Sequence, residues 1–179
     1  MKTTTTETSG ARADKRQGTL APAAVMEISK DLRVLLADVF ALYVKTKGFH
    51  WHITGRHFRD YHLMLDEQAE QIFAMADDIA ERGRKIGGTT LHSIGDIAQH
   101  KRISDETSAV SAEGMLAILA ADNSQLLTSL RHSHELCGQH NDVATTSMIE
   151  IWIDQTERRV WFLNATLEPD QAHKTGNRE

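Results

Sequence analysis

Residues 47–88 read KGFHWHITGRHFRDYHLMLDEQAEQIFAMADDIAERGRKIGG, and the spacing of the polar side chains in this stretch sets the organisation of the whole molecule. Five of its residues are imidazoles and carboxylates, the ligands that suit iron, manganese or zinc: His50, His62, Asp66, Asp77 and Glu81. At roughly 100° per residue, the last four fall on one face of a helix. At roughly 1.5 Å per residue, Asp77 lies about 22 Å beyond His62, too far for one metal ion to bind both pairs. The helix therefore carries two incomplete half-sites.

Two half-sites on one helix can be completed by a second copy of the chain. If two such helices pack antiparallel about a two-fold axis, the His62/Asp66 end of one meets the Asp77/Glu81 end of the other. His50 fits the same arrangement, because a break near residue 55 would let it lie level with His62 in an antiparallel hairpin. The spacing therefore predicts two identical metal sites per dimer.

Apolar residues recur every three or four positions along most of the chain, which is typical of helices. The expected helices run from about Pro22 to Trp51, from His57 to Gly87–Gly88, over a short stretch at Ser93–His100, from Ser111 to Gly138 and from Asp142 to Leu167. This order predicts an all-α fold, a ferritin-like four-helix bundle with a short extra helix in the long crossover between the second and third helices. We expect the bundle over residues 21–168, between a disordered N-terminal tail (1–20) and a flexible C-terminal tail (169–179).

The composition indicates a soluble protein of the cytoplasm. The 179 residues are enough for one domain with a sizeable core. A single cysteine, Cys137, excludes an internal disulfide, and the N-terminus lacks the apolar core of a signal peptide. The longest apolar run, Val34–Val44, is too short to span a bilayer, so no membrane association is expected. The net charge of −5 argues against a globally basic nucleic-acid-binding protein.

An ordinary di-iron bundle can be tested against the sequence. Such a site needs Glu-x-x-His on two helices and two further glutamates, all facing the bundle interior. No glutamate in this chain has a histidine three positions later. The intrachain site is therefore absent, and a bacterioferritin-type chain is disfavoured.

Several stretches of the chain together resemble a known family. They are Lys47–Gly55, Phe58, His62, Asp66, Asp77–Arg82, Asp142–Thr145 and Trp152–Leu163. Over about residues 22–167 the chain resembles the Dps family, the mini-ferritins or DNA-binding proteins from starved cells. The resemblance implies a hollow shell of twelve subunits that stores ferric oxide, with ferroxidase centres between two-fold-related subunits. It implies iron as the cofactor, as Fe(II) and Fe(III), and five residues as both catalytic residues and metal ligands: His50, His62 and Asp66 from one subunit, with Asp77 and Glu81 from the next.

Each half-site has a simpler interpretation when it is taken alone. The Asp77/Glu81 pair could lie on a solvated helix face, with exposed ion pairs to nearby basic residues that contribute little. The His62/Asp66 pair could be an ordinary hydrogen-bonded pair. The joint occurrence of both pairs with His50 favours the metal site.

Other residues near these positions keep two interpretations. Lys47 is either a partner of a ligand carboxylate or a surface charge. Trp51 is a core or interface aromatic, and the family resemblance also implies a place near the iron. Asp142 and Glu150 are candidates for acidic iron-entry pores, with helix capping as the alternative for Asp142. Six further histidines are expected at the surface or at caps: His52, His57, His92, His132, His134 and His140.

Two functions remain in view. The first is an iron-oxidising and iron-storing mini-ferritin that protects DNA from oxidative damage. The resemblance implies hydrogen peroxide as its oxidant, while the residues leave dioxygen open. The second is mainly architectural DNA compaction through the basic N-terminal tail, which would make the protein nucleoid-associated. The tail cations on which this second function depends are Lys2, Arg12, Lys15 and Arg16. The intact set of five ligands favours the first function.

Overall fold

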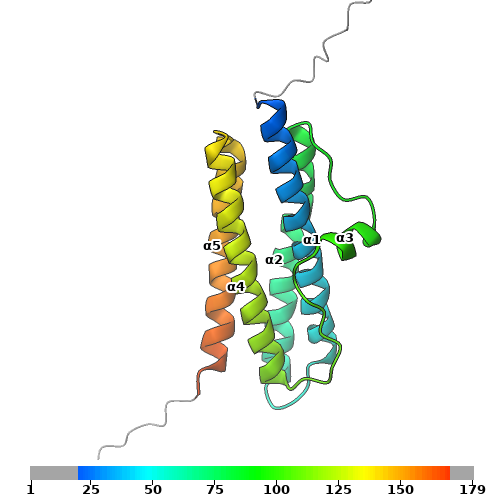
Figure 1. Cartoon of the computed structure of the whole chain (residues 1–179). Coiled ribbons are helices and arrows are strands. Elements are labelled where there is room, and N and C mark those ends of the chain that lie inside the picture. The colour runs from blue at the N-terminus through cyan, green and yellow to red at the C-terminus, as the bar shows by residue number, and fades with distance from the viewer. Residues whose placement is uncertain (1–19, 170–179) are drawn as a thin grey trace, which may run out of the picture.

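The computed structural model describes residues 20–169, and the long helices of this region form a four-helix bundle (Figure 1). They are α1 (Pro22–His52), α2 (Phe58–Lys85), α4 (Ala112–Gln139) and α5 (Val143–Leu167). The short α3 (Ile94–His100) lies in the crossover from α2 to α4 and packs against α1. The predicted all-α fold class, with its extra helix in the crossover, is confirmed. The two predicted tails fall almost entirely outside the described residues.

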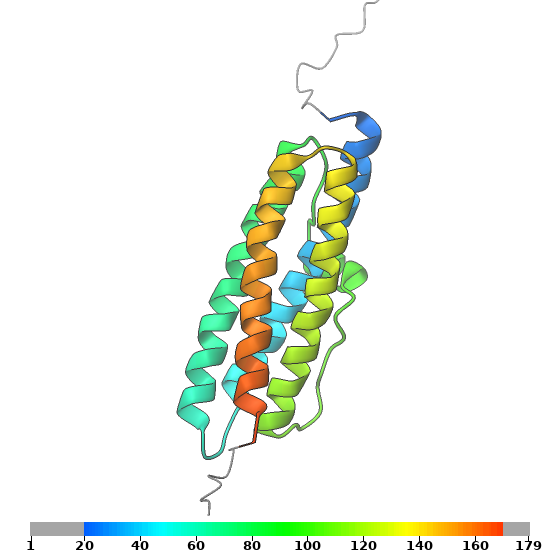
Figure 2. The same ribbon diagram turned by 90° about the vertical axis from the view of Figure 1, so that its left-hand side faces the viewer.

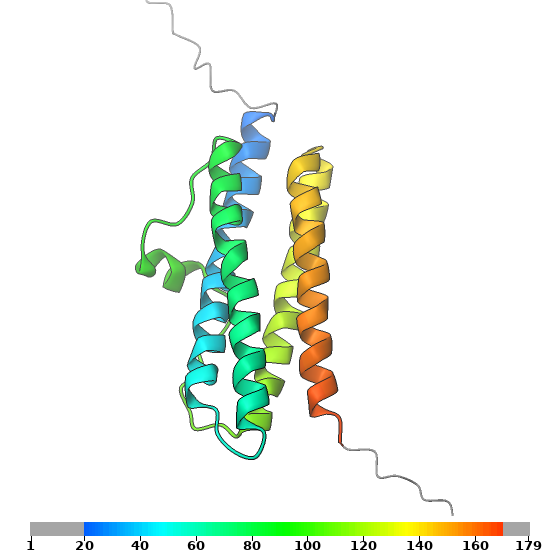
Figure 3. The same ribbon diagram turned by 180° about the vertical axis from the view of Figure 1, so that it is seen from behind.

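Two antiparallel hairpins make up the bundle, α1 with α2 and α4 with α5 (Figure 2). The hairpins join mainly where α1 packs along α4, whereas α2 and α5 contact each other much less. Seen from behind, α2 and α5 run side by side with α1 and α4 partly behind them (Figure 3). The start of α1 and the end of α5 lie at opposite ends of the bundle.

Local sequence chemistry explains where the helices begin and end. Pro22 is the first residue of α1, a position where its missing N–H has no helical partner to lose. Ser93, Ser111 and Asp142 cap α3, α4 and α5, each accepting a hydrogen bond from the backbone N–H three residues on. Gly55, in the loop between α1 and α2, has a φ of 109°, which glycine adopts without strain. The helices predicted from the sequence agree with the observed ones to within about two residues.

The core lies between the four long helices, and the apolar positions that recur with helical spacing fill it. The buried residues include Ile28, Leu32 and Leu35 of α1, Leu65, Ile72, Met75 and Ile79 of α2, Leu116, Leu119, Leu126 and Leu130 of α4, and Ile149, Trp152 and Leu163 of α5. Each such side chain stabilises the folded state by about 2 kcal/mol when it leaves water. No helix in the described region is long and apolar enough to cross a membrane.

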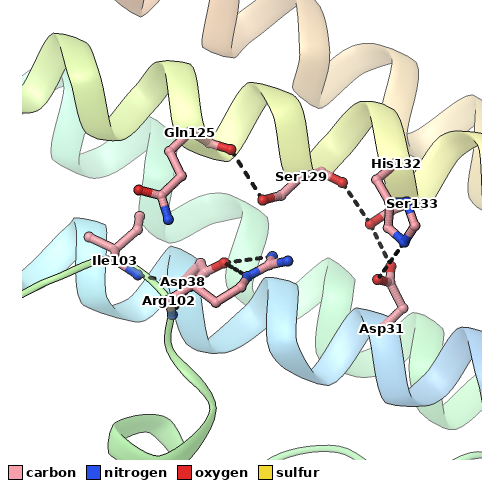
Figure 4. A network of polar contacts seen from close by, with 8 residues as sticks. All are labelled: Asp31, Asp38, Arg102, Ile103, Gln125, Ser129, His132 and Ser133. Atoms are coloured by element: carbon pink, nitrogen blue, oxygen red, sulfur yellow. Dashed lines mark hydrogen bonds and ion pairs between the residues drawn. The ribbon is translucent and has the colours of Figure 1, made fainter.

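Asp38 ties the crossover to α1 from inside the protein. Its side chain is 1% exposed and accepts hydrogen bonds from the backbone N–H groups of Arg102 (2.5 Å) and Ile103 (3.3 Å). The guanidinium of Arg102 bonds to the same carboxylate through Nε at 2.8 Å and Nη2 at 2.7 Å (Figure 4). Nearby, Ser133 of α4 donates a hydrogen bond to Asp31 at 2.5 Å. Carboxylates of α1 therefore hold both the crossover and α4.

Asp38→Ala is expected to lower the free energy of unfolding by about 3 kcal/mol, because two backbone N–H groups and a guanidinium lose a buried acceptor. Urea unfolding followed by circular dichroism measures the loss. Asp105→Ala is the matched control, since Asp105 is 75% exposed and pairs with Lys101 at 3.0 Å. An exposed pair of this kind contributes less than about 1 kcal/mol. Equal losses in the two variants would contradict the anchoring role of Asp38.

Candidate metal centre

The α1–α2 hairpin brings three of the five predicted ligands together. His50 lies in the last turn of α1, and His62 and Asp66 lie on successive turns of α2. The two imidazole rings stack with their centroids 3.7 Å apart and an interplanar angle of 21°. The loop of residues 53–57 reverses the chain, so histidines twelve positions apart in the sequence lie side by side, as their spacing predicts.

Each of the two histidines is held by the backbone of the other. His50 Nδ1 lies 2.8 Å from the carbonyl oxygen of His62, and His62 Nδ1 lies 2.9 Å from the carbonyl oxygen of His50. A carbonyl oxygen can only accept a hydrogen bond, so each Nδ1 carries the proton. A ring that carries its proton on Nδ1 alone has a free lone pair on Nε2, the form in which histidine binds a metal.

Asp66 lies beside the free nitrogen of His50. Its Oδ1 is 3.8 Å from His50 Nε2. Two atoms that bind one ion at about 2.1 Å each can lie no more than about 4.2 Å apart, so this pair can share a metal. Lys47 donates a hydrogen bond to the same oxygen at 2.5 Å, and this contact holds the pKa of Asp66 below its usual value. Lys47 is thus a partner of the carboxylate, and Asp66 bonds to it rather than to His62.

Asp77 and Glu81 form the second half-site, further along the same helix. Both side chains are exposed, and Glu81 pairs with Lys85 at 2.8 Å, which lowers the pKa of Glu81. Because α2 is one continuous helix, Asp77 stays about 22 Å from His62 along the axis. Within residues 20–169 of a single copy, no three or more His, Cys, Asp or Glu side chains are placed to hold one metal ion.

The face of α2 that carries the predicted ligands points away from the core of the bundle. At roughly 100° per residue, these ligands span about 0–100° around the helix, measured from His62. The buried residues Leu65, Ile72 and Ile79 lie at about 260–300° on the same scale. The four predicted ligands of α2 therefore lie on the outer side of the helix, whereas an ordinary di-iron bundle directs its ligands inward, and His50 of α1 is buried beside them.

Phe73 lies on the same outer face and was not singled out by the sequence analysis. It sits at about 20° on the scale above, near the midpoint between the two half-sites. Its side chain is 52% exposed, and its ring centroid is 4.9 Å from that of Tyr43. The signal that could have revealed it is an aromatic residue among the charged side chains of this helix face.

The buried polar positions of the bundle are held by side chains that do not suit an intrachain di-iron site. Asn123, Thr156 and Arg159 lie at the centre of the described region. Arg159 is 1% exposed and donates hydrogen bonds to Asn123 Oδ1 at 2.9 Å and Thr156 Oγ1 at 2.7 Å. Burial lowers the pKa of Arg159 to about 10, so the side chain is still a cation at neutral pH. A buried cation disfavours the binding of a metal ion beside it.

The structure settles several of the alternatives that the sequence left open. Trp51 is 65% exposed, so the core interpretation is wrong and the interface interpretation stays a prediction. Asp142 is 4% exposed, caps α5 and pairs with Arg82 at 2.5 Å. Capping is therefore its role, and a buried carboxylate that is paired with Arg82 gives no charge to a pore.

Glu150 pairs at the surface with His134 at 3.0 Å, and its pore role stays a prediction. None of the six further histidines is buried, as expected.

Comparison with known proteins gives consistent matches over most of the chain. Residues 29–171 match the model of the ferritin-like domain. The chain is 31% identical to DNA protection during starvation protein 1 of Deinococcus radiodurans over 145 residues, which cover 80% of this chain and 70% of that protein. It is 29% identical to DNA protection during starvation protein of Brevibacillus brevis over 133 residues, 74% of this chain and 89% of that protein.

Solved structures match the fold as closely. The Dps protein from Vibrio cholerae O1, described as a member of a broad superfamily of ferritin-like diiron-carboxylate proteins, superposes with a TM-score of 0.82 at 26% identity. That match covers 87% of this chain and 99% of the other. The antigen TpF1 from Treponema pallidum gives a TM-score of 0.81 at 28% identity, over 86% and 99% of the two chains. With its four-helix bundle and crossover helix, the chain belongs to the Dps family of ferritin-like proteins.

Proposed function

We propose that the chain is a ferroxidase mini-ferritin, in which two copies form two sites that oxidise Fe(II) and twelve copies enclose the ferric product. One observation carries the proposal: His50, His62 and Asp66 lie together in the α1–α2 hairpin, His50 buried and the other two half-buried, with Nε2 of both histidines left over by the Nδ1 contacts. The description of the Vibrio cholerae relative as a diiron-carboxylate protein supports iron as the substrate. The names of the two DNA protection proteins support a protective role.

A second copy would supply the missing carboxylates of each site. A two-fold contact places each patch of one copy on the other patch of its partner. With the two α2 helices antiparallel, the axis passes midway between the half-sites, close to Phe73, which is exposed on this face. Phe73 would then pack against the partner's Phe73, and Asp77 and Glu81 would reach the partner's His62 and Asp66. The exposed aromatic residue thus lies where a two-fold contact needs apolar surface.

The proposed ligand set suits the oxidation of iron. Imidazole and carboxylate ligands bind Fe(II) and leave positions open for an oxidant. Negative carboxylates stabilise Fe(III) more than Fe(II), which favours loss of an electron. The resemblance to the family supports hydrogen peroxide as the oxidant. Two Fe(II) ions then give one electron each, the O–O bond breaks, and two protons complete two water molecules. Because both electrons are delivered together, no hydroxyl radical leaves the site.

Two lysines balance the charge of the half-sites before iron binds. Lys47 bonds to Asp66, and Lys85 bonds to Glu81. Both pairs are partly exposed to water, where such contacts are weak enough for a divalent ion to displace them. Each lysine would release its carboxylate to iron, so two of the three carboxylates of each proposed site are paired with a cation while iron is absent.

Mixing two inactive variants tests whether each site is shared between copies. Asp77→Ala with Glu81→Ala removes one half-site, and His50→Ala with His62→Ala removes the other. In a mixed dimer one site is complete and the second lacks four side chains, so random exchange should restore about a quarter of the wild-type sites. Stopped-flow measurement of Fe(II) oxidation gives the recovered rate, and native mass spectrometry shows the exchange. Demonstrated exchange without recovery would exclude the shared site.

Phe73→Glu tests the proposed contact without touching a ligand. It places two carboxylates opposite each other at the axis, so the dimer should dissociate and Fe(II) oxidation should fall by at least about tenfold as the shared sites are lost. Light scattering after size exclusion gives the mass, and stopped-flow absorbance gives the rate. Phe73→Leu is the matched control, because it keeps an apolar side chain and should preserve both. An assembled and active Phe73→Glu protein would place the two-fold contact elsewhere.

A second function, DNA binding, is favoured by the charge of the N-terminal tail. Residues 1–19 lie outside the described residues and carry a net charge of about +2, whereas the rest of the chain is acidic. We propose that this tail binds phosphate non-specifically, and that twelve tails on one shell bind together. Such binding would place the protein on DNA in the cytoplasm. The proposed contacts are Lys2, Arg12, Lys15 and Arg16.

Deleting residues 1–18 is expected to abolish DNA binding and to leave Fe(II) oxidation unchanged, because every proposed ligand lies beyond position 49. Binding by the full-length protein should weaken steeply between about 50 and 200 mM salt, since neutralising phosphates releases counterions. Gel-shift titrations measure both effects. A control variant with the four tail cations changed to Gln keeps the length of the tail and removes its positive charges. Equal binding by the truncated protein would place the DNA surface on the bundle.

A further inference from the structure

A cavity of about 420 Å³ lies where the last turns of α4 pass the first turns of α1. Asp31, which lines it, precedes His50 by nineteen residues of the continuous α1, or about 28 Å along the helix axis. The cavity is therefore separate from the residues proposed to oxidise iron. Its charged lining consists of Glu27, Lys30, Asp31, Arg102, His132 and Glu135.

A histidine and a carboxylate face each other across this cavity. His132 of α4 points toward Asp31 of α1, and its Nε2 lies 3.9 Å from Asp31 Oδ1 (Figure 4). That distance is too long for a hydrogen bond. It is shorter than the limit of about 4.2 Å for two atoms that each bind one ion at about 2.1 Å. The two atoms are thus spaced to share a metal ion.

Asp31 is held in this orientation from inside the protein. Ser133, which is 1% exposed, donates a hydrogen bond to Asp31 Oδ2 at 2.5 Å. The side chain of Asp31 is 15% exposed, so most of the carboxylate is shielded from water. Hydrogen bonds of this kind orient the carboxylates that bind metals in proteins. Oδ1, the oxygen that Ser133 does not contact, is the one nearest to His132.

Two other histidines of α4 or its C-terminal end approach carboxylates differently. Nε2 of His140 lies 2.9 Å from Glu27, and Nε2 of His134 lies 3.0 Å from Glu150. Both of these pairs are direct hydrogen bonds. His132 and its carboxylate are instead about 1 Å further apart, which leaves room for an ion between them.

The charge of the cavity favours a cation. Arg102 is already neutralised by Asp38, with its Nη2 at 2.7 Å from that carboxylate. The three lining carboxylates then face one further cation, Lys30, which leaves a charge of about −2 when the imidazole is neutral. Glu135 is exposed and lies one helical turn after His132, so rotation of its side chain can bring a second carboxylate to the same ion.

We propose that this cavity is a second metal site, which binds a divalent transition ion such as Zn²⁺ through His132 Nε2 and Asp31 Oδ1. Glu135 would rotate to become the third ligand, since no three such side chains of the described region are already placed around one ion. A nitrogen ligand beside carboxylates favours transition ions over Mg²⁺ and Ca²⁺. The inference goes beyond the proposed function, because the site is contained in one copy and shares no residue with the iron half-sites.

Zinc binding tests the site in a full-length protein that lacks all four side chains removed in the mixing experiment. Equilibrium dialysis with elemental analysis should find one Zn²⁺ per subunit in this background. Adding His132→Gln or Asp31→Asn should weaken the binding at least about tenfold, because each removes a ligand. His134→Gln is the matched control, since it removes another histidine of α4 that already pairs with a carboxylate.

Two further measurements separate a built site from an acidic surface. Ser133→Ala should weaken Zn²⁺ binding by about tenfold without removing a ligand, because Asp31 loses the contact that orients it. A hundredfold excess of Mg²⁺ should leave Zn²⁺ bound, because Mg²⁺ prefers oxygen ligands. Circular dichroism checks that each variant is folded.

Three results would overturn the assignment. Zinc binding that is unchanged by His132→Gln would remove the histidine from the site. An equal loss with His134→Gln would show only general binding to surface histidines, and displacement by Mg²⁺ would show only an acidic patch. Failure of the proposed function looks different: the parent protein would not oxidise Fe(II), while Zn²⁺ binding would still depend on His132.

Discussion

The stiffness of α2 is the constraint on which the rest of the molecule depends. A continuous helix holds His62 and Asp66 at a constant distance from Asp77 and Glu81, and no rotation of side chains closes a gap of about 22 Å. The proposed ligands of one chain therefore form two separate groups. The hairpin adds His50 to the group that contains His62 and Asp66, because the short turn around Gly55 places His50 against His62. A metal site that uses both groups would need a second copy of the chain.

The side of α2 that packs into the bundle differs from the side that carries the proposed ligands. One face packs apolar side chains into the bundle, and the opposite face carries the proposed ligands toward the outside. In the interior, the Arg159 guanidinium donates hydrogen bonds to an amide and a hydroxyl through Nε and Nη2, while its Nη1 has no partner. A buried cation without an anionic partner costs stability, and the strong hydrophobic packing around it offsets that cost. The bundle is thus a scaffold with a buried cation in its polar interior and with the proposed ligands of α2 on its outer side.

The proposed chemistry and the proposed assembly use the same surfaces. The half-site residues of α2 and the exposed Phe73 lie on one side of that helix, turned away from the core. Reciprocal hydrogen bonds fix the two histidines before a partner arrives, which lowers the conformational entropy lost when the site forms. In the single chain, Lys47 bonds to Asp66 and Lys85 bonds to Glu81. In the proposed site, these contacts would order the side chains of the single chain before a second copy and iron bind.

The sequence by itself determined the helices, their ends and the division of the ligands into two groups. Helical spacing, capping residues such as Ser111 and Asp142, and the rise of an α-helix are local properties, and they do not depend on what packs where. Only the tertiary structure decided which carbonyl each imidazole bonds to, that Lys47 reaches Asp66, and that Asp142 is buried against Arg82. It also decided that Trp51 and Phe73 are exposed while Trp152 is not. These outcomes depend on contacts between helices that are far apart in the sequence. Hydrophobicity alone does not distinguish an aromatic residue that is buried in the core from one that stays exposed on the single chain.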